Sequence, residues 1–131
     1  MYRWIEHTAE LELEIKAPTQ RAVYEDALAA YAELVGDEES HDAERRTIEI
    51  TAEDRETLLA EWLDELVYLS DAQQFVPEHL TDMRLEGNSL RATVRGHRGD
   101  PTPLVKAVTR HRLSFEPDGR GGWGARVVLD V

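Results

Sequence analysis

The chain has 131 residues, of which 41% are hydrophobic and 32% are charged, and its formal net charge is −12. This length predicts one domain with a single core. The negative charge argues against stable, direct binding of RNA or DNA, because phosphate contacts need clustered lysine and arginine. The lack of cysteine excludes disulfides and thiolate metal sites. The sequence shows neither a leader-like N-terminus nor an apolar run of membrane-spanning length, so we expect a cytoplasmic protein.

The first third of the chain predicts a strand, a helix and a second strand. Apolar and charged residues alternate over 11–16, as in a strand with one buried face. Thr19 is the expected N-cap of a helix that Gly36 ends. The polar segment 37–45 is expected to be a solvated loop, and Ile48 and Ile50 then alternate in the second strand.

A second helix is predicted to begin near Asp54, where apolar residues start to recur in a wide double row typical of a central core helix. These residues are Leu58, Leu59, Trp62, Leu63, Leu66 and Val67. Two alternating runs then flank Gly87-Asn88-Ser89 and predict a hairpin. A loop at 99–103 leads to Lys106, and a last hairpin is expected to turn at Pro117-Asp118-Gly119.

Together these elements predict an α/β (α+β) fold. Two helices pack on a mostly antiparallel or mixed sheet, because an amphipathic helix and a half-apolar sheet bury their apolar faces against each other. Neither an internal repeat nor a low-complexity segment interrupts the pattern, so we expect one compact domain over residues 1–131.

Two acidic residues stand at strand ends and point away from the core. In the first strand the odd positions are apolar, so Glu10 faces outward, and the alternation over 123–129 places Asp130 outward too. Solvated strand ends are the ordinary interpretation. However, Val131 adds an α-carboxylate beside Asp130, and three hard oxygen groups suit Ca²⁺, Mg²⁺ or Mn²⁺. His7 is either a nitrogen ligand or a residue that orients the loop.

Four short motifs resemble those of the archease family. Residues 6–10 read EHTAE, like the family's E-H-T-A-D, and 62–66 read WLDEL, like W-L-N-E-L. Residues 105–111 read VKAVTRH, like V-K-A-V-T-Y-H, and the final LDV at 129–131 resembles F-D-I. Each motif is weak by itself, but their order and their spread over nearly the whole chain make the resemblance specific to an archease-like domain.

Three positions depart from these motifs. Glu10 stands where the family has aspartate, Asp64 where it has asparagine and Arg110 where it has tyrosine. Glu10 matters most, because one extra methylene displaces a carboxylate by about the length of a bond. The change leaves the fold assignment intact and bears on the affinity and the identity of any metal.

The resemblance implies a function that composition alone does not indicate. Archeases are protein cofactors, without catalysis of their own, of the RtcB-type RNA ligase: they promote its metal-dependent guanylylation and its multiple turnover in tRNA splicing and RNA repair. By this resemblance Glu10 and Asp130 would hold the metal, with Val131 as third ligand, and Lys106 would act at the partner's active site. Lys106 is one of two lysines among 15 basic residues, the other being Lys16.

Two other classes of function stay open. One is a small metal-dependent phosphoester hydrolase that uses Glu10 and Asp130 with His7 as base, although the sequence offers no second His or acid cluster at ligand spacing. The other is a chaperone-like interaction module that needs no metal, for which an acidic surface would suffice. Turnover of simple phosphoesters would favour the hydrolase, and ligase stimulation that survives loss of Asp130 would favour the module.

Overall fold

The computed structural model describes residues 1–36 and 42–131, which form two helices and seven strands. The elements, in chain order, are β1 (Tyr2–His7), β2 (Glu10–Ala17), α1 (Gln20–Val35), β3 (Ala43–Thr51), α2 (Arg55–Gln73), β4 (Phe75–Glu86), β5 (Ser89–Arg98), β6 (Ala107–Pro117) and β7 (Trp123–Asp130). The predicted class, with two helices and antiparallel strands in one compact domain, is confirmed. Neither described helix is long and apolar enough to cross a membrane.

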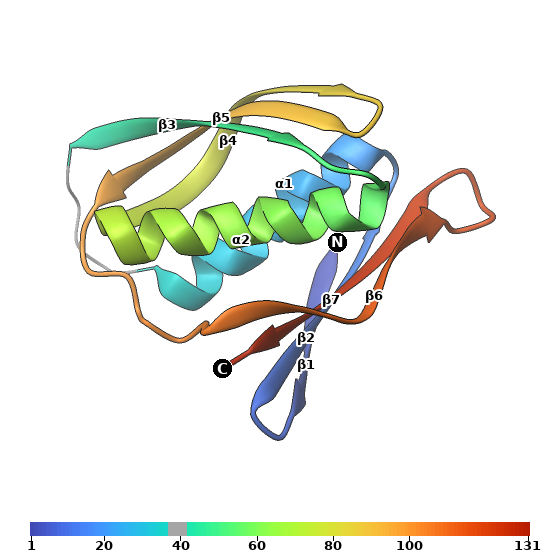
Figure 1. Cartoon of the computed structure of the whole chain (residues 1–131), viewed down its shortest axis with the longest axis horizontal. Helices are drawn as coiled ribbons and strands as arrows, with labels where there is room; N and C mark the ends of the chain where they lie inside the picture. The colour runs from blue at the N-terminus through green and yellow to red at the C-terminus, as the bar shows by residue number, and fades with distance from the viewer. Residues whose placement is uncertain (37–41) are drawn as a thin grey trace.

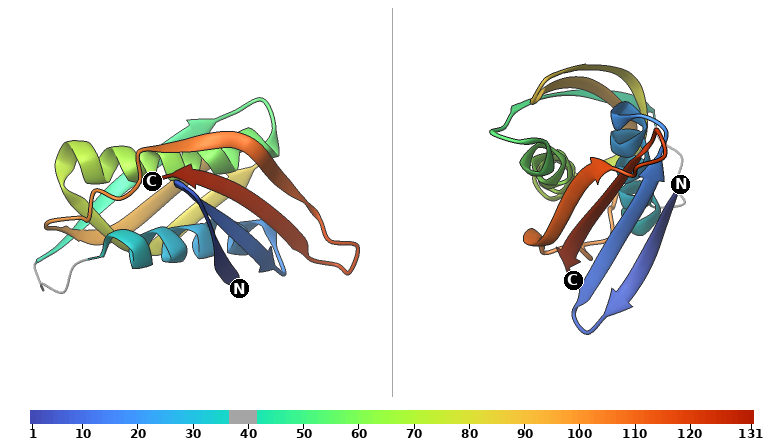
Figure 2. Two further views of the ribbon diagram at one scale, coloured as in Figure 1. Left: turned by 90° about the horizontal axis from the view of Figure 1, so that it is seen from below. Right: turned by 90° about the vertical axis from the view of Figure 1, so that its right-hand side faces the viewer.

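The strands divide into two antiparallel sheets with the helices between them (Figures 1 and 2). Sheet A has the order β1-β2-β7-β6, and sheet B has the order β3-β5-β4. Helix α1 contacts β2 and β4, while α2 contacts β4 and β6, so each helix packs against both sheets. One face of each sheet is therefore buried on the helices, and the opposite face, which we call the outer face, points away from them.

The predicted helix starts are confirmed by their caps. The Thr19 side chain accepts a hydrogen bond from the amide of Ala22 at 3.1 Å, and the Asp54 carboxylate accepts one from the amide of Thr57 at 2.8 Å. These bonds satisfy amides that have no partner within the helix. Gly36 follows the last residue of α1, and its amide donates to the carbonyl of Ala32 at 2.8 Å.

A chain of buried contacts ties the two helices to sheet B. The Trp62 indole N–H of α2 donates to the carbonyl of Tyr24 in α1 at 3.2 Å, and their rings meet edge to face. The Tyr31 hydroxyl lies 2.9 Å from the hydroxyl of Ser70, which in turn donates to the carbonyl of Phe75 at 2.9 Å. All of these polar groups are buried, and buried polar groups stabilise a fold only when they are paired in this way.

Two strand boundaries differ from those expected, and one strand was not predicted. Residues 43–45, predicted as the end of a loop, belong to β3; of the remaining loop residues, 42 precedes the strand and 37–41 lie outside the described residues. Strand β6 begins at Ala107, before the predicted hairpin, because it pairs with β7 over 107–109, loses register, and pairs again from Ser114. Strand β1 was not predicted, since Ile5 on its outer face blurs the alternation.

Candidate functional site

Glu10 and Asp130 lie opposite each other at one end of sheet A. They are register partners across β2 and β7, so their side chains project from the same face of the sheet. Directly opposed residues of an antiparallel pair have Cβ atoms about 5 Å apart. The prediction from alternation, that both carboxylates point away from the helices, agrees with the burial of their neighbours Leu13, Val127 and Leu129 on the opposite face.

Lys106 is fixed to the same end of the sheet by its backbone. Its amide donates to the carbonyl of Asp130 at 2.8 Å, just before β6 begins at Ala107, the register partner of Asp130. The Lys106 side chain is exposed, and its ammonium forms no ion pair with any described residue. The three residues come from the beginning, the end and the last third of the chain, and the sheet brings them together.

Val131 closes this end of the sheet. Its amide donates to the carbonyl of Ala9 at 3.2 Å, which joins the end of β7 to the turn between β1 and β2. Ala9 has a φ of 59°, a left-handed conformation that lets two residues connect the register partners His7 and Glu10. This bond places Val131 beside the turn that leads into Glu10.

His7 is turned along the sheet rather than toward Asp130. Its Nε2 lies 3.8 Å from a carboxylate oxygen of Glu12. In residues 1–36 and 42–131, no group of three or more His, Asp or Glu side chains is arranged to hold a metal ion. The site therefore offers two side-chain carboxylates, whose hard oxygens fit a divalent cation that takes its remaining ligands from a main-chain group or water.

Arg112 is the residue at this site that the sequence analysis missed. Its terminal nitrogen lies 3.2 Å from a Glu10 carboxylate oxygen, and its Nε lies 3.3 Å from Glu12. The first contact joins residues 102 positions apart, and Arg112 has a φ of 55° within the irregular part of β6. No local sequence pattern signals this contact, because it depends on how β6 bends over β7.

Glu12 is the centre of a wider set of ion pairs on the outer face of sheet A. It is only 5% exposed; Arg112 contacts one of its carboxylate oxygens, and the Nε of Arg126 lies 3.4 Å from the other. Arg126 also approaches Glu14 at 3.8 Å, and Glu14 pairs with Arg3 at 3.2 Å. We call this set the ion-pair chain; in spatial order it consists of Arg3, Glu14, Arg126, Glu12, Arg112 and Glu10.

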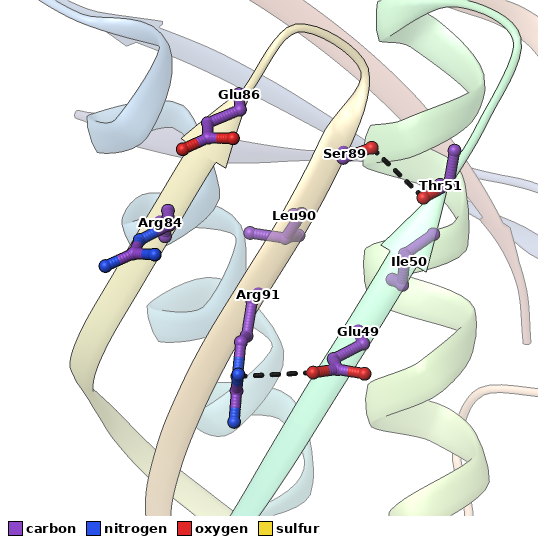
Figure 3. Close-up of a pocket in the computed structure, with 8 residues that line it drawn as sticks. All are labelled: Glu49, Ile50, Thr51, Arg84, Glu86, Ser89, Leu90 and Arg91. Carbon is purple, nitrogen blue, oxygen red and sulfur yellow. Dashed lines mark hydrogen bonds and ion pairs between the residues drawn. The ribbon is translucent and has the colours of Figure 1, made fainter.

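A shallow hollow lies elsewhere, on the outer face of sheet B (Figure 3). Its volume is about 290 Å³, and charged, hydroxyl-bearing and apolar residues of β3, β4 and β5 line it. Arg91 lies 3.2 Å from Glu49 there, and the hydroxyls of Thr51 and Ser89 are 3.0 Å apart (Figure 3). None of the site residues predicted from the sequence, which are His7, Glu10, Lys106, Asp130 and Val131, lines this hollow.

The comparison with known families decides the identity of the domain. Residues 2–131 match the Archease protein family (MTH1598/TM1083). The chain belongs to the archease family. The Methanosarcina mazei archease is 33% identical, over 99% of this chain and 95% of its own length. The probable archease of Mycobacterium tuberculosis is 34% identical, over 99% of this chain and 74% of its own length.

Solved archease structures have the same fold. The solution structure of Methanobacterium thermoautotrophicum protein 1598 matches with a TM-score of 0.75 and 29% identity, over 99% of this chain and 98% of that one. The crystal structure of the Thermotoga maritima protein, described as an archease and possible chaperone, matches with a TM-score of 0.71 and 28% identity, over 100% and 98%. The resemblance inferred from the four short motifs is thus confirmed over the whole chain.

Proposed function

We propose that this archease is a non-catalytic activator of an RtcB-type RNA ligase, promoting the ligase's guanylylation and multiple turnover in tRNA splicing and RNA repair. The observation that supports the proposal is the meeting of Glu10, Asp130 and Lys106 at one end of sheet A, since all three lie in segments that match archease motifs. A cytoplasmic location and a protein partner with a basic surface are part of this proposal, because the chain carries a net charge of −12.

In this proposal, one end of sheet A presents charge to the partner's reacting phosphates. Glu10 and Asp130, with an α-carboxylate on Val131, would hold a Ca²⁺, Mg²⁺ or Mn²⁺ ion, which when bound supplies positive charge against phosphate oxygens. Lys106 contributes a second positive charge. Its ammonium forms no ion pair with residues 1–36 or 42–131 that would have to break, and its backbone is fixed by the hydrogen bond to Asp130. Positioned charge is the main contribution that a protein makes to nucleotidyl transfer.

The proposal is tested by single-turnover guanylylation of the purified ligase with limiting archease. We expect Lys106→Ala to fold and to bind the ligase, yet to lose about a hundredfold in stimulated rate, the usual effect of removing one positioned charge. Lys106→Arg keeps the charge with another shape and should be partly active. The control is Lys16→Ala, the other lysine, which lies on β2 about 20 Å from Glu10 along the strand. Equal rates for wild type, Lys106→Ala and Lys16→Ala would contradict the proposal.

The two other functional classes give different outcomes in the same preparations. A hydrolase would release product from simple phosphoesters without the ligase, whereas we expect the archease alone to be inactive on phosphoesters and on GTP. An interaction module without metal would stimulate the ligase equally well after Asp130→Ala. The hydrolase class gains no support from His7, its proposed base, whose Nε2 lies 3.8 Å from a carboxylate oxygen of Glu12.

A further inference from the structure

Arg112 spans the strand that carries Asp130. In sheet A, β7 lies between β6 and β2, so a side chain that starts on β6 and contacts Glu10 on β2 must cross the outer face of β7. Asp130 is the register partner of Glu10 on β7. A guanidinium therefore already lies against one of the two carboxylates to which a divalent ion would bind.

Glu12 holds Arg112 in this position. A carboxylate that is only 5% exposed needs close cations to offset its lost hydration. Arg112 and Arg126 supply them at 3.3 and 3.4 Å. The left-handed backbone of Arg112 lies in the irregular stretch of β6 between Thr109 and Ser114, where the strand leaves the register of its neighbour. Both features direct the guanidinium toward β2.

The length of Glu10 completes the contact. Its carboxylate meets the terminal nitrogen of Arg112 at 3.2 Å, whereas an aspartate, as in the archease motif, would end one methylene shorter. The Glu10 and Arg112 side chains are 33% and 40% exposed, so the pair is open to exchange with solvent and ions.

We propose that Arg112 is an internal counterion that competes with a divalent cation for Glu10 and so lowers the metal affinity of this archease. The inference rests on the metal site of the proposed function and concerns the positioning of one ligand. Binding of a divalent ion at Glu10 and Asp130 displaces the guanidinium from Glu10 and leaves it on Glu12. Arg112 thereby sets the concentration of metal at which the site fills.

Calorimetric titration with CaCl₂, repeated with MgCl₂ and MnCl₂, tests the inference on the purified full chain. We expect Arg112→Gln to bind about fivefold to tenfold more tightly than wild type, because it removes both the competitor and a nearby positive charge. The matched control is Arg126→Gln, which removes the other arginine on Glu12 but no contact with Glu10. Its affinity should stay within about twofold of wild type, since its charge is more distant and is screened.

A double-mutant cycle separates competition from a general change in charge. Glu10→Asp shortens the carboxylate and should also tighten binding in the wild-type background, but it should add nothing once Arg112 is glutamine. A spectroscopic readout complements it: the Arg112 Nε–Hε resonance of the wild type should shift with the same midpoint as the calorimetric titration. Asp130→Ala should abolish both signals, and far-UV circular dichroism checks that each variant is folded.

Each outcome has a definite meaning. Equal affinities for wild type and Arg112→Gln, or equal tightening by Arg112→Gln and Arg126→Gln, would refute the role of Arg112. Metal binding that survives Asp130→Ala would place the ion elsewhere and refute the inference as well. Absence of metal binding in every variant would overturn both the inference and the metal part of the proposed function. The ligase assay with Lys106 variants would still stand as a separate test, because it supplies the ligase with its own metal and compares variants of a residue that is not a proposed metal ligand.

Discussion

The outer faces of the two sheets carry the same types of charged residue, glutamate and arginine, in different arrangements. On sheet A, acids and arginines alternate along the ion-pair chain, and Glu12 is nearly buried among them. On sheet B, Arg45 is the register partner of Arg95, and Arg84 is that of Arg91. Of these four arginines, only Arg91 forms an ion pair within the described part of the chain, with Glu49 (Figure 3). Like charges in opposed positions are unfavourable. Organised charge is thus found on the sheet that carries the candidate site.

A backbone difference between the sheets gives the largest predicted effect. A Cβ on Gly96 in β5 would lie 2.1 Å from the carbonyl oxygen of Val76, whereas a Cβ on Gly124 in β7 would meet nothing closer than 4.0 Å. We expect Gly96→Ala to lower the free energy of unfolding by about 3 kcal/mol, because β4 must shift. The matched variant Gly124→Ala should change it by about 0.5 kcal/mol or less. Urea denaturation measures both changes. Equal midpoints would show that β4 can shift to accommodate the new methyl group without a loss of unfolding free energy.

The second prediction compares one acid from each outer face. Glu12→Gln removes a nearly buried charge shared by Arg112 and Arg126, and we expect a loss of about 2 kcal/mol in unfolding free energy. This is below the usual value for a buried pair because the two arginines are 40% and 43% exposed. Glu49→Gln removes one exposed pair with Arg91 and should cost about 0.5 kcal/mol or less. If both variants shift the urea midpoint equally, Glu12 stabilises the fold no more than an exposed acid does, and the prediction is wrong.

The smallest effect concerns the opposed arginines of sheet B. Arg95→Glu converts the pair with Arg45 from like to opposite charge, and we expect a gain of about 0.5 kcal/mol in unfolding free energy at low salt. The gain should shrink at 1 M NaCl, where the screening length is about 3 Å. The control is the same change in an Arg45→Ala background, where the gain should be absent. A gain of equal size in that background would show that the stabilisation comes from replacing Arg95 and not from its pairing with Arg45.

Local patterns in the sequence predicted most of the fold. Helix caps at Thr19 and Asp54 and the alternation around Ile48 and Leu13 depend on neighbours a few residues away, and the structure confirms them. The division into two sheets was not predictable in this way. Alternation shows which side of a strand is buried, but it does not show which strand lies beside it.

The residues of the candidate site also fall into those that local sequence patterns predict and those that require knowledge of the strand order. Glu10 and Asp130 could be placed on one face by counting residues, and their direct opposition in register adds to that expectation. Arg112 could not be found, because its contact with Glu10 requires the order of strands in sheet A and a left-handed residue in an irregular stretch of β6. The metal ligands and the role of Lys106 stay predictions, for which the experiments above are designed.

The position of β7 has a consequence for how the domain is made. Strand β7 is the last strand in the sequence, yet it lies in the middle of sheet A, between the early strand β2 and β6. During synthesis on the ribosome, β2 emerges long before its neighbour exists, and β2 and β6 stay apart until β7 is released. Such distant pairing is slow to form. Glu10 and Asp130 can therefore meet only after β7 has been synthesised, so that a chain interrupted before β7 cannot display this charged surface.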